Sequence, residues 1–400
     1  MFTVRAQCAN SLGRAGTLKL AHGRVRTPAF VPLATRGAVK GLDAQEVAGL
    51  GYELILANTF HLMLAPGAEL VQELGGLHEL MRWSGPIITD SGGFQVFSMG
   101  HGAVADEIKG RGRRREEEGR ILSIDEDGVR FRSYVDGRER FLGPEGSMAV
   151  QAALGSDIAL TFDECTPFHV TREYTERSTA RTHRWLSRCL RWHEEHGPKQ
   201  QAVYGIVQGG VEQDLRRESA QAVAASRCDG IAIGGSLGRD KSQMHEVVSW
   251  ATGELERQAP SRPRHLLGIG EIDDLIACVE LGVDTFDCAV PTRLGRHGVA
   301  LVPEPQARWR VDLFKGRWSH SREPILEGCP CPACARGYSR AYLHYLLRAH
   351  ELTAVRLLTI HNLSFVARLM GDLRAGIEAG RLAEVAAALR AGAAPQDSAA

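Results

Sequence analysis

Short apolar runs that end on polar residues recur along the chain and alternate with stretches that suit helices. The residues that close six of these runs are Asp90, Asp163, Gln208, Gly235, Glu271 and Asp287. Each run is rich in β-branched or aliphatic residues, which is typical of strands buried on both faces of a parallel sheet. In (β/α)8 barrels, the active site is built at the carboxyl ends of the strands. The pattern therefore predicts an α/β fold, a (β/α)8 barrel, with a site at the strand ends.

Turn residues and local periodicity predict further elements between these runs. They are β-structure within residues 1–30, a helix over 44–50 capped by Asp43, a strand over 52–57, an amphipathic helix over 70–80, and a hairpin of strands 129–134 and 138–142 joined by Asp136 and Gly137. Residues 100–120 are charged and interspersed with glycine, which predicts a mobile surface insertion. An arm that contacts RNA is the alternative for this segment.

Composition limits the classes of function. The chain has 400 residues, 44% of them hydrophobic, which suffices for a large core, and α/β barrels often exceed the usual length of one domain. The 48 Lys and Arg residues balance 48 Asp and Glu residues, so an RNA-binding surface must be local. No apolar run approaches the ~18 residues of a membrane span, and no signal-peptide pattern opens the chain. The nine cysteines, an odd number, indicate a reducing compartment, so we expect a cytoplasmic protein.

Three cysteines within six residues predict a metal site. Cys329, Cys331 and Cys334 are separated by prolyl steps, and His361 follows in a segment of helical periodicity. Three thiolates and an imidazole suit a closed, tetrahedral structural zinc site, whereas three unpaired cysteines in a turn are a rare alternative. On spacing alone, His344 and His350 compete with His361 for the fourth position.

Three of the strand-end residues are aspartates, and together they suit chemistry at an anomeric carbon. One can attack the sugar, a second can move a proton, and a third can hold the hydrogen-bonding edge of a base. A single aspartate at such a position is more often a strand-end or helix cap. Asp90, Asp163 and Asp287, each within its own motif, favour a common site.

The motifs around these residues resemble those of bacterial tRNA-guanine transglycosylases, the queuine tRNA-ribosyltransferase family, over residues 2–380. They are Asn58-Thr-Phe-His-Leu, Gly75-Gly-Leu-His, Thr89-Asp-Ser-Gly-Gly-Phe-Gln-Val-Phe-Ser, Phe162-Asp-Glu-Cys-Thr-Pro, Gly205-Ile-Val-Gln-Gly, Phe286-Asp-Cys-Ala-Val-Pro-Thr-Arg and the cysteine cluster. The resemblance implies an irregular (β/α)8 barrel with an attached zinc-binding helical subdomain, usually as a homodimer. We expect the barrel over 1–322, the subdomain over 323–380, and a partly disordered tail over 381–400.

The resemblance also implies an activity. Members of this family exchange the wobble guanine of tRNAs with GUN anticodons, those for aspartate, asparagine, histidine and tyrosine, for 7-aminomethyl-7-deazaguanine. The exchange passes through a covalent enzyme–ribose intermediate and is a step of queuosine biosynthesis. We therefore expect tRNA and a 7-deazaguanine-type base as partners, and one structural Zn²⁺ per chain.

Roles carry over to matching positions. Asp287 resembles the nucleophile, and Asp90 the proton acceptor and donor. The base-binding set is Asp90, Ser91, Gly92, Gly93, Phe94, Asp163, Gln208 and Gly235. The RNA-contacting set is Gly268, Ile269, Gly270, Glu271, Ile272, Asp273, Asp274, Thr292, Arg293, Leu294, Gly295 and Arg296. The metal ligands are Cys329, Cys331, Cys334 and His361.

One loop departs from the family pattern and leaves the identity of the base open. Many members read Gly-Gly-Leu-Ala-Val-Gly-Glu where this chain has Gly234-Gly-Ser-Leu-Gly-Arg-Asp240, and the missing Glu lies near the 7-substituent of the base. Direct queuine salvage is therefore an alternative. A catalytically silent RNA-binding partner subunit is a second, although it would be expected to lack Asp90 or Asp287. A glycoside hydrolase on this scaffold would need neither the zinc subdomain nor the Thr292–Arg296 turn.

Overall fold

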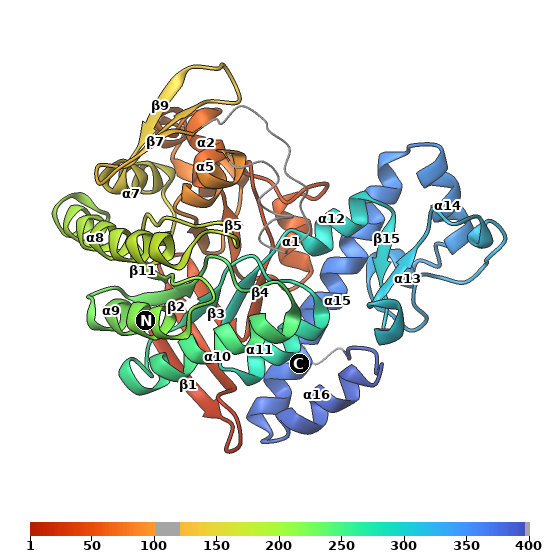
Figure 1. Ribbon diagram of the computed structural model, residues 1–400. Coiled ribbons are helices and arrows are strands. Elements are labelled where there is room, and N and C mark those ends of the chain that lie inside the picture. The colour runs from red at the N-terminus through yellow and green to blue at the C-terminus, as the bar shows by residue number, and fades with distance from the viewer. Residues whose placement is uncertain (101–120, 397–400) are drawn as a thin grey trace.

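A parallel barrel forms the body of the protein (Figure 1). The computed structural model describes residues 1–100 and 121–396, so most of the predicted insertion at 100–120 lies outside it. Eight strands of the described chain pair in parallel, in the order β4–β14–β13–β12–β11–β10–β6–β5. The Ala34 amide donates to the Leu56 carbonyl at 2.6 Å, and the Leu56 amide to that of Pro32 at 3.1 Å, which joins the two edges. The predicted barrel is confirmed.

The barrel strands are short and coincide with the predicted apolar runs. They are β4 (Ala29–Val31), β5 (Ile55–Ala57), β6 (Ile87–Thr89), β10 (Ile158–Leu160), β11 (Ala202–Val207), β12 (Gly230–Ile233), β13 (Arg264–Leu266) and β14 (Thr285–Asp287). Seven of these strands are buried at every position, and β4 lacks full burial only at its first residue. Burial on both faces explains the continuous apolar runs.

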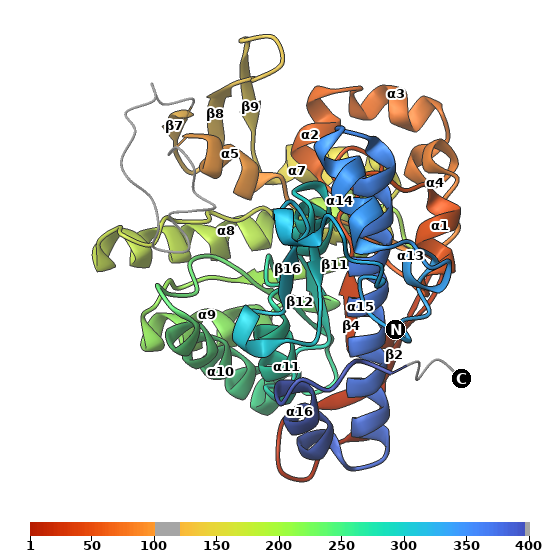
Figure 2. The same cartoon turned by 90° about the vertical axis from the view of Figure 1, so that its right-hand side faces the viewer.

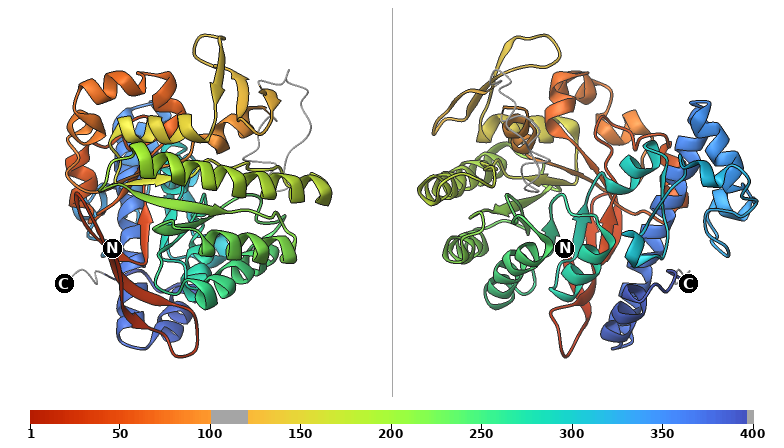
Figure 3. Two further views of the ribbon diagram at one scale, coloured as in Figure 1. Left: turned by 90° about the vertical axis from the view of Figure 1, so that its left-hand side faces the viewer. Right: turned by 45° about the vertical axis from the view of Figure 1, so that its right-hand side comes forward.

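Helices surround the strands as an outer layer (Figure 3). Those that follow barrel strands or precede the next one include α2 (Thr59–Leu64), α5 (Gly93–Gly100), α7 (Pro144–Leu154), α8 (Arg172–His196), α9 (Gln213–Ala225), α10 (Lys241–Gln258), α11 (Ile272–Glu280) and α12 (Val290–Arg296). On α8, Trp185, Leu186 and Cys189 are buried while charged residues lie between them. This one-sided burial is what an amphipathic helix on a barrel requires.

The local predictions succeeded where capping or turn residues set the boundary. Asp43 caps α1 (Ala44–Gly49) through a capping box with Glu46. The predicted hairpin is present as β8 (Val129–Arg132) and β9 (Glu139–Leu142), with β7 (Ile121–Ile124) added beside β8.

The single helix predicted over 70–80 is wrong. Gly75 has a φ of +91°, so the segment divides into α3 (Ala68–Glu73) and α4 (Gly76–Met81). The apolar periodicity continues across Gly75 and Gly76, so it does not show where the helix ends. The break depends on the positive φ that these glycines adopt.

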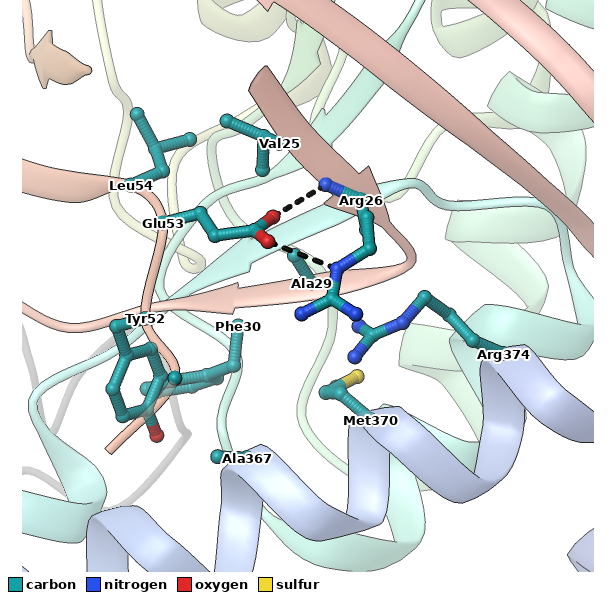
Figure 4. A pocket seen from close by; sticks show the side chains of 11 residues that line it. Val25, Arg26, Ala29, Phe30, Tyr52, Glu53, Leu54, Ala367, Met370 and Arg374 are labelled. Atoms are coloured by element: carbon teal, nitrogen blue, oxygen red, sulfur yellow. Dashed lines mark hydrogen bonds and ion pairs between the residues drawn. The ribbon is translucent and has the colours of Figure 1, made fainter. Parts of the chain in front are cut away.

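An antiparallel sheet lies at the amino ends of the barrel strands. It contains β1 (Phe2–Gln7), β2 (Arg14–Leu20) and β3 (Gly23–Thr27). In the pocket of Figure 4, Arg26 of β3 pairs with Glu53, at 2.9 Å, just before β5. Arg374 enters the same pocket and donates to the Pro28 carbonyl at 2.7 Å. The predicted site residues do not line this pocket, which lies at the opposite end of the strands.

The C-terminal part forms a smaller unit that remains attached to the barrel (Figures 1 and 2). It contains β15 (Val299–Leu301), β16 (Arg310–Asp312), α13 (Pro332–Ala335) and α14 (Arg340–Arg348), which share a core of their own. The long helix α15 (Leu352–Glu378) contacts this unit and also α12 and β4 of the barrel. Within the predicted tail, α16 (Leu382–Arg390) packs on α15. Among the described helices, none has the length and apolarity needed to cross a bilayer.

Candidate active site and metal centre

The three predicted carboxylates lie at the carboxyl ends of barrel strands. Asp90 follows β6, Asp163 lies three residues after β10, and Asp287 ends β14. Asp163 and Asp287 are buried, Asp90 is partly buried, and their charges act on one another. The charge of Asp287 raises the pKa of Asp90, and that of Asp90 raises the pKa of Asp163, in both cases less than burial does. The barrel therefore brings together residues that are up to 197 positions apart in sequence.

Asp90 is held by donors from two neighbouring segments. The Asn58 and Gln95 side-chain amides donate to Oδ2 at 2.5 Å and 2.6 Å, and the Thr59 backbone amide donates to Oδ1 at 2.8 Å. Burial raises the pKa of Asp90 to about 6 although these donors oppose the shift. A carboxyl that titrates near neutral pH, held in one orientation, suits a general acid and base.

Asp163 lies between Ser91 and Gln208. The Ser91 hydroxyl donates to Oδ1 at 2.9 Å, and the Gln208 amide donates to Oδ2 at 2.6 Å. Burial raises the pKa of Asp163 to about 6 as well. At Gly235, whose φ is +79°, an added Cβ would lie 2.1 Å from Oε1 of Gln208, so a side chain does not fit there. The Asp163 carboxylate and neighbouring backbone groups can therefore meet the edge of a flat heterocycle.

The loop that contains Gly92 and Gly93 leads to an exposed aromatic ring. Gly92 has a φ of +78°, and a Cβ on Gly93 would lie 2.7 Å from the Asp163 carbonyl oxygen. Phe94, on the first turn of α5, is 39% exposed, unlike the buried apolar residues that surround it. A ring exposed beside buried carboxylates is available to stack on a planar ligand.

Asp287 has a histidine neighbour that sequence analysis did not identify. Nε2 of His265 lies 3.1 Å from Oδ1 of Asp287, and its Nδ1 lies 2.9 Å from the Thr285 hydroxyl. The Gly268 amide also donates to Oδ1, at 3.3 Å. Oδ1 is therefore engaged on the protein side, and no contact to Oδ2 is recorded among the described residues. This arrangement fixes the carboxylate while leaving one oxygen for a reacting atom.

The four predicted metal ligands meet in a buried cluster. Sγ of Cys331 and Sγ of Cys334 each lie 3.4 Å from Nδ1 of His361, and Sγ of Cys329 lies 3.8 Å away. Ligands at usual Zn–S and Zn–N lengths lie about 3.6 Å apart in a tetrahedron. Nε2 of His361 faces the Leu301 carbonyl at 2.8 Å, which directs Nδ1 towards the sulfurs. The cluster can hold a metal ion, and the donor set fits zinc.

Comparison with known proteins agrees with this combination of sites. The sequence model of the family described as Queuine tRNA-ribosyltransferase matches residues 8–394. The chain belongs to this family. It is 46% identical over 395 residues to a Queuine tRNA-ribosyltransferase of Roseiflexus sp. (strain RS-1), covering 96% of this chain and 98% of the relative. Proteins of the same name from Symbiobacterium thermophilum and Protochlamydia amoebophila are 45% and 43% identical, covering 94% and 92% of this chain and 86% and 92% of the relatives.

The two segments predicted to contact RNA, residues 268–274 and 292–296, lie before and after Asp287 in the sequence. Their side chains differ in solvent exposure. Arg293 is exposed and Arg296 is partly exposed, and the pKa of Arg296 is lowered by burial and then by the charge of Arg293. Buried members of the two sets are Gly270, Ile272, Asp274, Thr292 and Gly295. Two neighbouring guanidiniums on α12, which begins three residues after Asp287, are suited to phosphate. These buried residues can fix the backbone of the two segments, but their side chains are not available to contact a ligand.

A second unforeseen residue, Arg216, supports the loop that departs from the family pattern. Its guanidinium is fully buried and donates to the carbonyls of Val207, Gly210, Gly234 and Ser236 at 2.7–3.1 Å. Burial lowers the pKa of Arg216 to about 9. The Ser236 carbonyl therefore already accepts a charged donor. Nothing in the polar sequence of α9 distinguishes Arg216 from its exposed neighbour Arg217.

Other missed residues had a weak signal. Asn58 follows β5 as Asp90 follows β6, so its position at a strand end was available from the pattern of runs. His265 is the central residue of β13, between Arg264 and Leu266, and a buried polar residue in a barrel strand indicates a polar partner. Both act on residues that the sequence analysis did identify.

Proposed function

We propose that this chain exchanges the wobble guanine of tRNAs with GUN anticodons for 7-aminomethyl-7-deazaguanine through a covalent enzyme–ribose intermediate. Membership of the queuine tRNA-ribosyltransferase family supports base exchange in tRNA as the class of reaction. The observation that carries the proposal is the meeting of Asp90, Asp163 and Asp287 at one end of the barrel. A silent binding subunit would not need these carboxylates, and a glycoside hydrolase would use two of them but would need neither the zinc subdomain nor the Thr292–Arg296 turn.

In the first step, Oδ2 of Asp287 attacks C1′ of the wobble nucleotide. The C1′–O bond forms as the C1′–N9 bond breaks, and the leaving guanine takes a proton at N9 from protonated Asp90. His265 and the Gly268 amide hold Oδ1, so the free oxygen keeps its orientation towards the sugar.

In the second step, the incoming base loses its N9 proton to the Asp90 carboxylate, and N9 attacks C1′ while the bond to Asp287 breaks. Asp90 is then protonated again and ready for another guanosine. A pKa of about 6 allows both protonation states near neutral pH, which this alternation requires.

Base and RNA recognition follow from the same surroundings. Asp163 accepts from N1–H and the exocyclic amine of a guanine-like ring, Gln208 and the Gly235 backbone complete the edge, and Phe94 stacks on the ring. Arg293 and Arg296 hold phosphates on either side of the extruded nucleotide. We propose that the remaining RNA contacts come from the backbone and exposed atoms of 268–274 and 292–296.

We propose zinc as the metal of the Cys329, Cys331, Cys334 and His361 cluster, and a homodimer as the working assembly. A Cys₃His set is closed, so the ion would hold the C-terminal unit together and take no part in the exchange. When bound, zinc would supply structural cross-linking only.

The decisive test is trapping of the covalent intermediate. Wild-type protein incubated with tRNA and a 7-deazaguanine-type base should give a protein–RNA adduct on denaturing electrophoresis. Asp287→Asn should bind tRNA but form no adduct, because an amide is a very poor nucleophile. Asp136→Asn, which alters an exposed aspartate in the β8–β9 turn, is the matched control and should form the adduct normally. An adduct in Asp287→Asn would move the nucleophile to another residue.

Direct use of queuine is a second candidate, favoured by the loop at 234–240. Asp240 caps α10 by accepting from the Gln243 amide at 3.0 Å, and Ser236 is engaged by Arg216. A cationic aminomethyl group thus meets no dedicated carboxylate on this loop. Exchange assays with both bases and labelled tRNA distinguish the two candidates by their kcat/KM values.

A further inference from the structure

A second group of potential metal ligands lies at the end of the barrel opposite the carboxylates. His22 occupies the turn between β2 and β3, His78 lies on α4, and Asp157 immediately precedes β10. The potential ligand atoms of these residues all lie within 4.8 Å of one another. We propose that these three side chains bind a divalent first-row transition metal such as Zn²⁺, independently of the cysteine cluster.

The distances suit one ion bridging all three side chains. Nδ1 of His22 lies 3.0 Å from Oδ1 of Asp157, and Nε2 of His78 lies 3.2 Å from Oδ2. The two imidazole rings stack with centroids 3.6 Å apart and an interplanar angle of 19°. Nitrogen and oxygen ligands at zinc lie about 3.4 Å apart in a tetrahedral arrangement, so small adjustments admit the ion.

The carboxylate is oriented without help from the imidazoles. The Ile87 backbone amide donates to Oδ2 of Asp157 at 2.9 Å, and the His22 backbone amide donates to Oδ1 at 3.0 Å. These two bonds persist if a metal replaces the imidazole N–H contacts. Outer contacts of this kind fix the ligands of protein metal sites before the ion arrives.

Exposure leaves a path for the ion and a position for water. The Asp157 side chain is fully buried, that of His78 is 12% exposed, and that of His22, which stacks on His78, is 46% exposed. Two imidazoles and one carboxylate favour Zn²⁺, Ni²⁺ or Cu²⁺ over Mg²⁺ or Ca²⁺, which prefer oxygen ligands. Three protein ligands with an open fourth position distinguish this site from the closed Cys₃His cluster.

Without a metal, the same contacts form a hydrogen-bonded link between the β2–β3 turn, α4 and the start of β10. If the cluster provides only these hydrogen bonds, its role is to hold the three segments together. The two possibilities differ in what His22 contributes, because a hydrogen bond can be kept by a residue that binds zinc poorly. His22→Asn retains an amide N–H for Asp157, whereas His22→Ala removes the contact.

The experiment measures metal stoichiometry and affinity on the full chain carrying one zinc in its cysteine cluster. Wild type should bind a second equivalent of Zn²⁺ in calorimetric titration and show a higher Tm with it. Both His22→Ala and His22→Asn should weaken this second binding by more than about 100-fold, because even outer-contact losses weaken metal sites about 10- to 100-fold. His320→Ala, which alters an exposed histidine elsewhere, should bind as wild type does.

Cobalt gives an independent spectroscopic readout. A second equivalent of Co²⁺ in wild type should add d–d absorption without further thiolate-to-metal charge transfer, since the proposed site contains no sulfur. Failure of wild type to bind a second ion would overturn the proposal. Undiminished binding in a folded His22→Asn or His22→Ala variant, checked by circular dichroism, would overturn it equally.

Discussion

The carboxylate cluster and the cysteine cluster are both buried groups of polar side chains, yet they are organised in opposite ways. In the cysteine cluster, every metal-binding atom faces the same centre, and His361 is directed by the Leu301 carbonyl. In the carboxylate cluster, burial raises the pKa values of Asp90 and Asp163 to about 6, and each acid is held by neutral donors. One cluster is complete once an ion is bound, whereas the other keeps ionisable oxygens for a substrate.

The difference shows how burial can serve stability or chemistry. Charges removed from water must be compensated, and a dication would offset most of the charge of three thiolates, beside which Arg368 donates to Sγ of Cys329 at 3.2 Å. Neutral hydrogen-bond donors compensate only in part, so the carboxyls remain near their titration point. The predictions below test each side of this contrast, from the largest expected effect to the smallest.

The strongest expected effect is loss of the C-terminal unit's fold when the cysteine cluster is broken. Cys331→Ala, or removal of zinc by a chelator, should abolish metal binding and expose the 325–378 segment to limited proteolysis, because the metal's binding energy is part of the folding energy. Cys8→Ala, which alters a partly buried thiol outside the cluster, should leave zinc content and proteolysis unchanged. A folded, active wild-type protein without bound metal would contradict this assignment.

Asp90→Asn tests the proton transfer that we propose for the carboxylate cluster. Loss of proton transfer at N9 should lower kcat by roughly 100- to 10,000-fold, with tRNA affinity retained, because the amide keeps the volume but cannot shuttle a proton. Single-turnover exchange of labelled guanine measures this effect, and Asp136→Asn serves as the control. Near-normal turnover would mean that water or another residue handles the proton.

A smaller effect is expected in the choice of base. A charge-assisted hydrogen bond contributes about 1.5–3 kcal/mol, so the absence of the family's loop Glu should reduce preference for the aminomethyl base over uncharged analogues by about one to two decades. The measurement is kcat/KM for 7-aminomethyl-7-deazaguanine, its cyano analogue, queuine and guanine. Strong preference for the first with complete exclusion of queuine would show that another group replaces the missing Glu.

The mildest test changes only pH. Above about 6, Asp163 is mostly ionised and can accept from N1–H of guanine, whereas below it the protonated acid loses part of this capacity. Guanine affinity should therefore fall by up to about tenfold per pH unit below 6. Asp163→Asn should bind weakly at every pH. Asp90→Asn should keep a pH dependence but shift it to lower pH, because the charge of Asp90 raises the pKa of Asp163. A flat profile in wild type would exclude Asp163 as the acceptor.

Sequence patterns predicted the parts of the fold that depend on local chemistry. The apolar runs predicted the barrel strands because burial on both faces favours apolar residues in them. Asp43 predicted a helix start because its side chain replaces a missing backbone partner. The spacing of Cys329, Cys331 and Cys334 predicted a metal cluster because three thiols are brought close by the chain itself.

Other features depended on contacts between distant segments. The helix predicted over 70–80 ignored the left-handed turn at Gly75, which the packing of α3 and α4 requires. His265, Asn58 and Arg216 gained their roles only when the strands closed into a barrel. Spacing alone also left His344 and His350 as rivals of His361, and only the position of α15 brings His361 to the sulfurs.

By itself, the sequence determined the strand pattern, the acids at the strand ends and the cysteine trio, because each follows from local periodicity or spacing. The tertiary structure decided the pKa values of Asp90 and Asp163, the partner of Asp287 and the fourth metal-binding atom. These properties depend on burial and on distances between residues far apart in sequence. Both the burial and these distances arise when the barrel closes, so a local sequence pattern does not predict them.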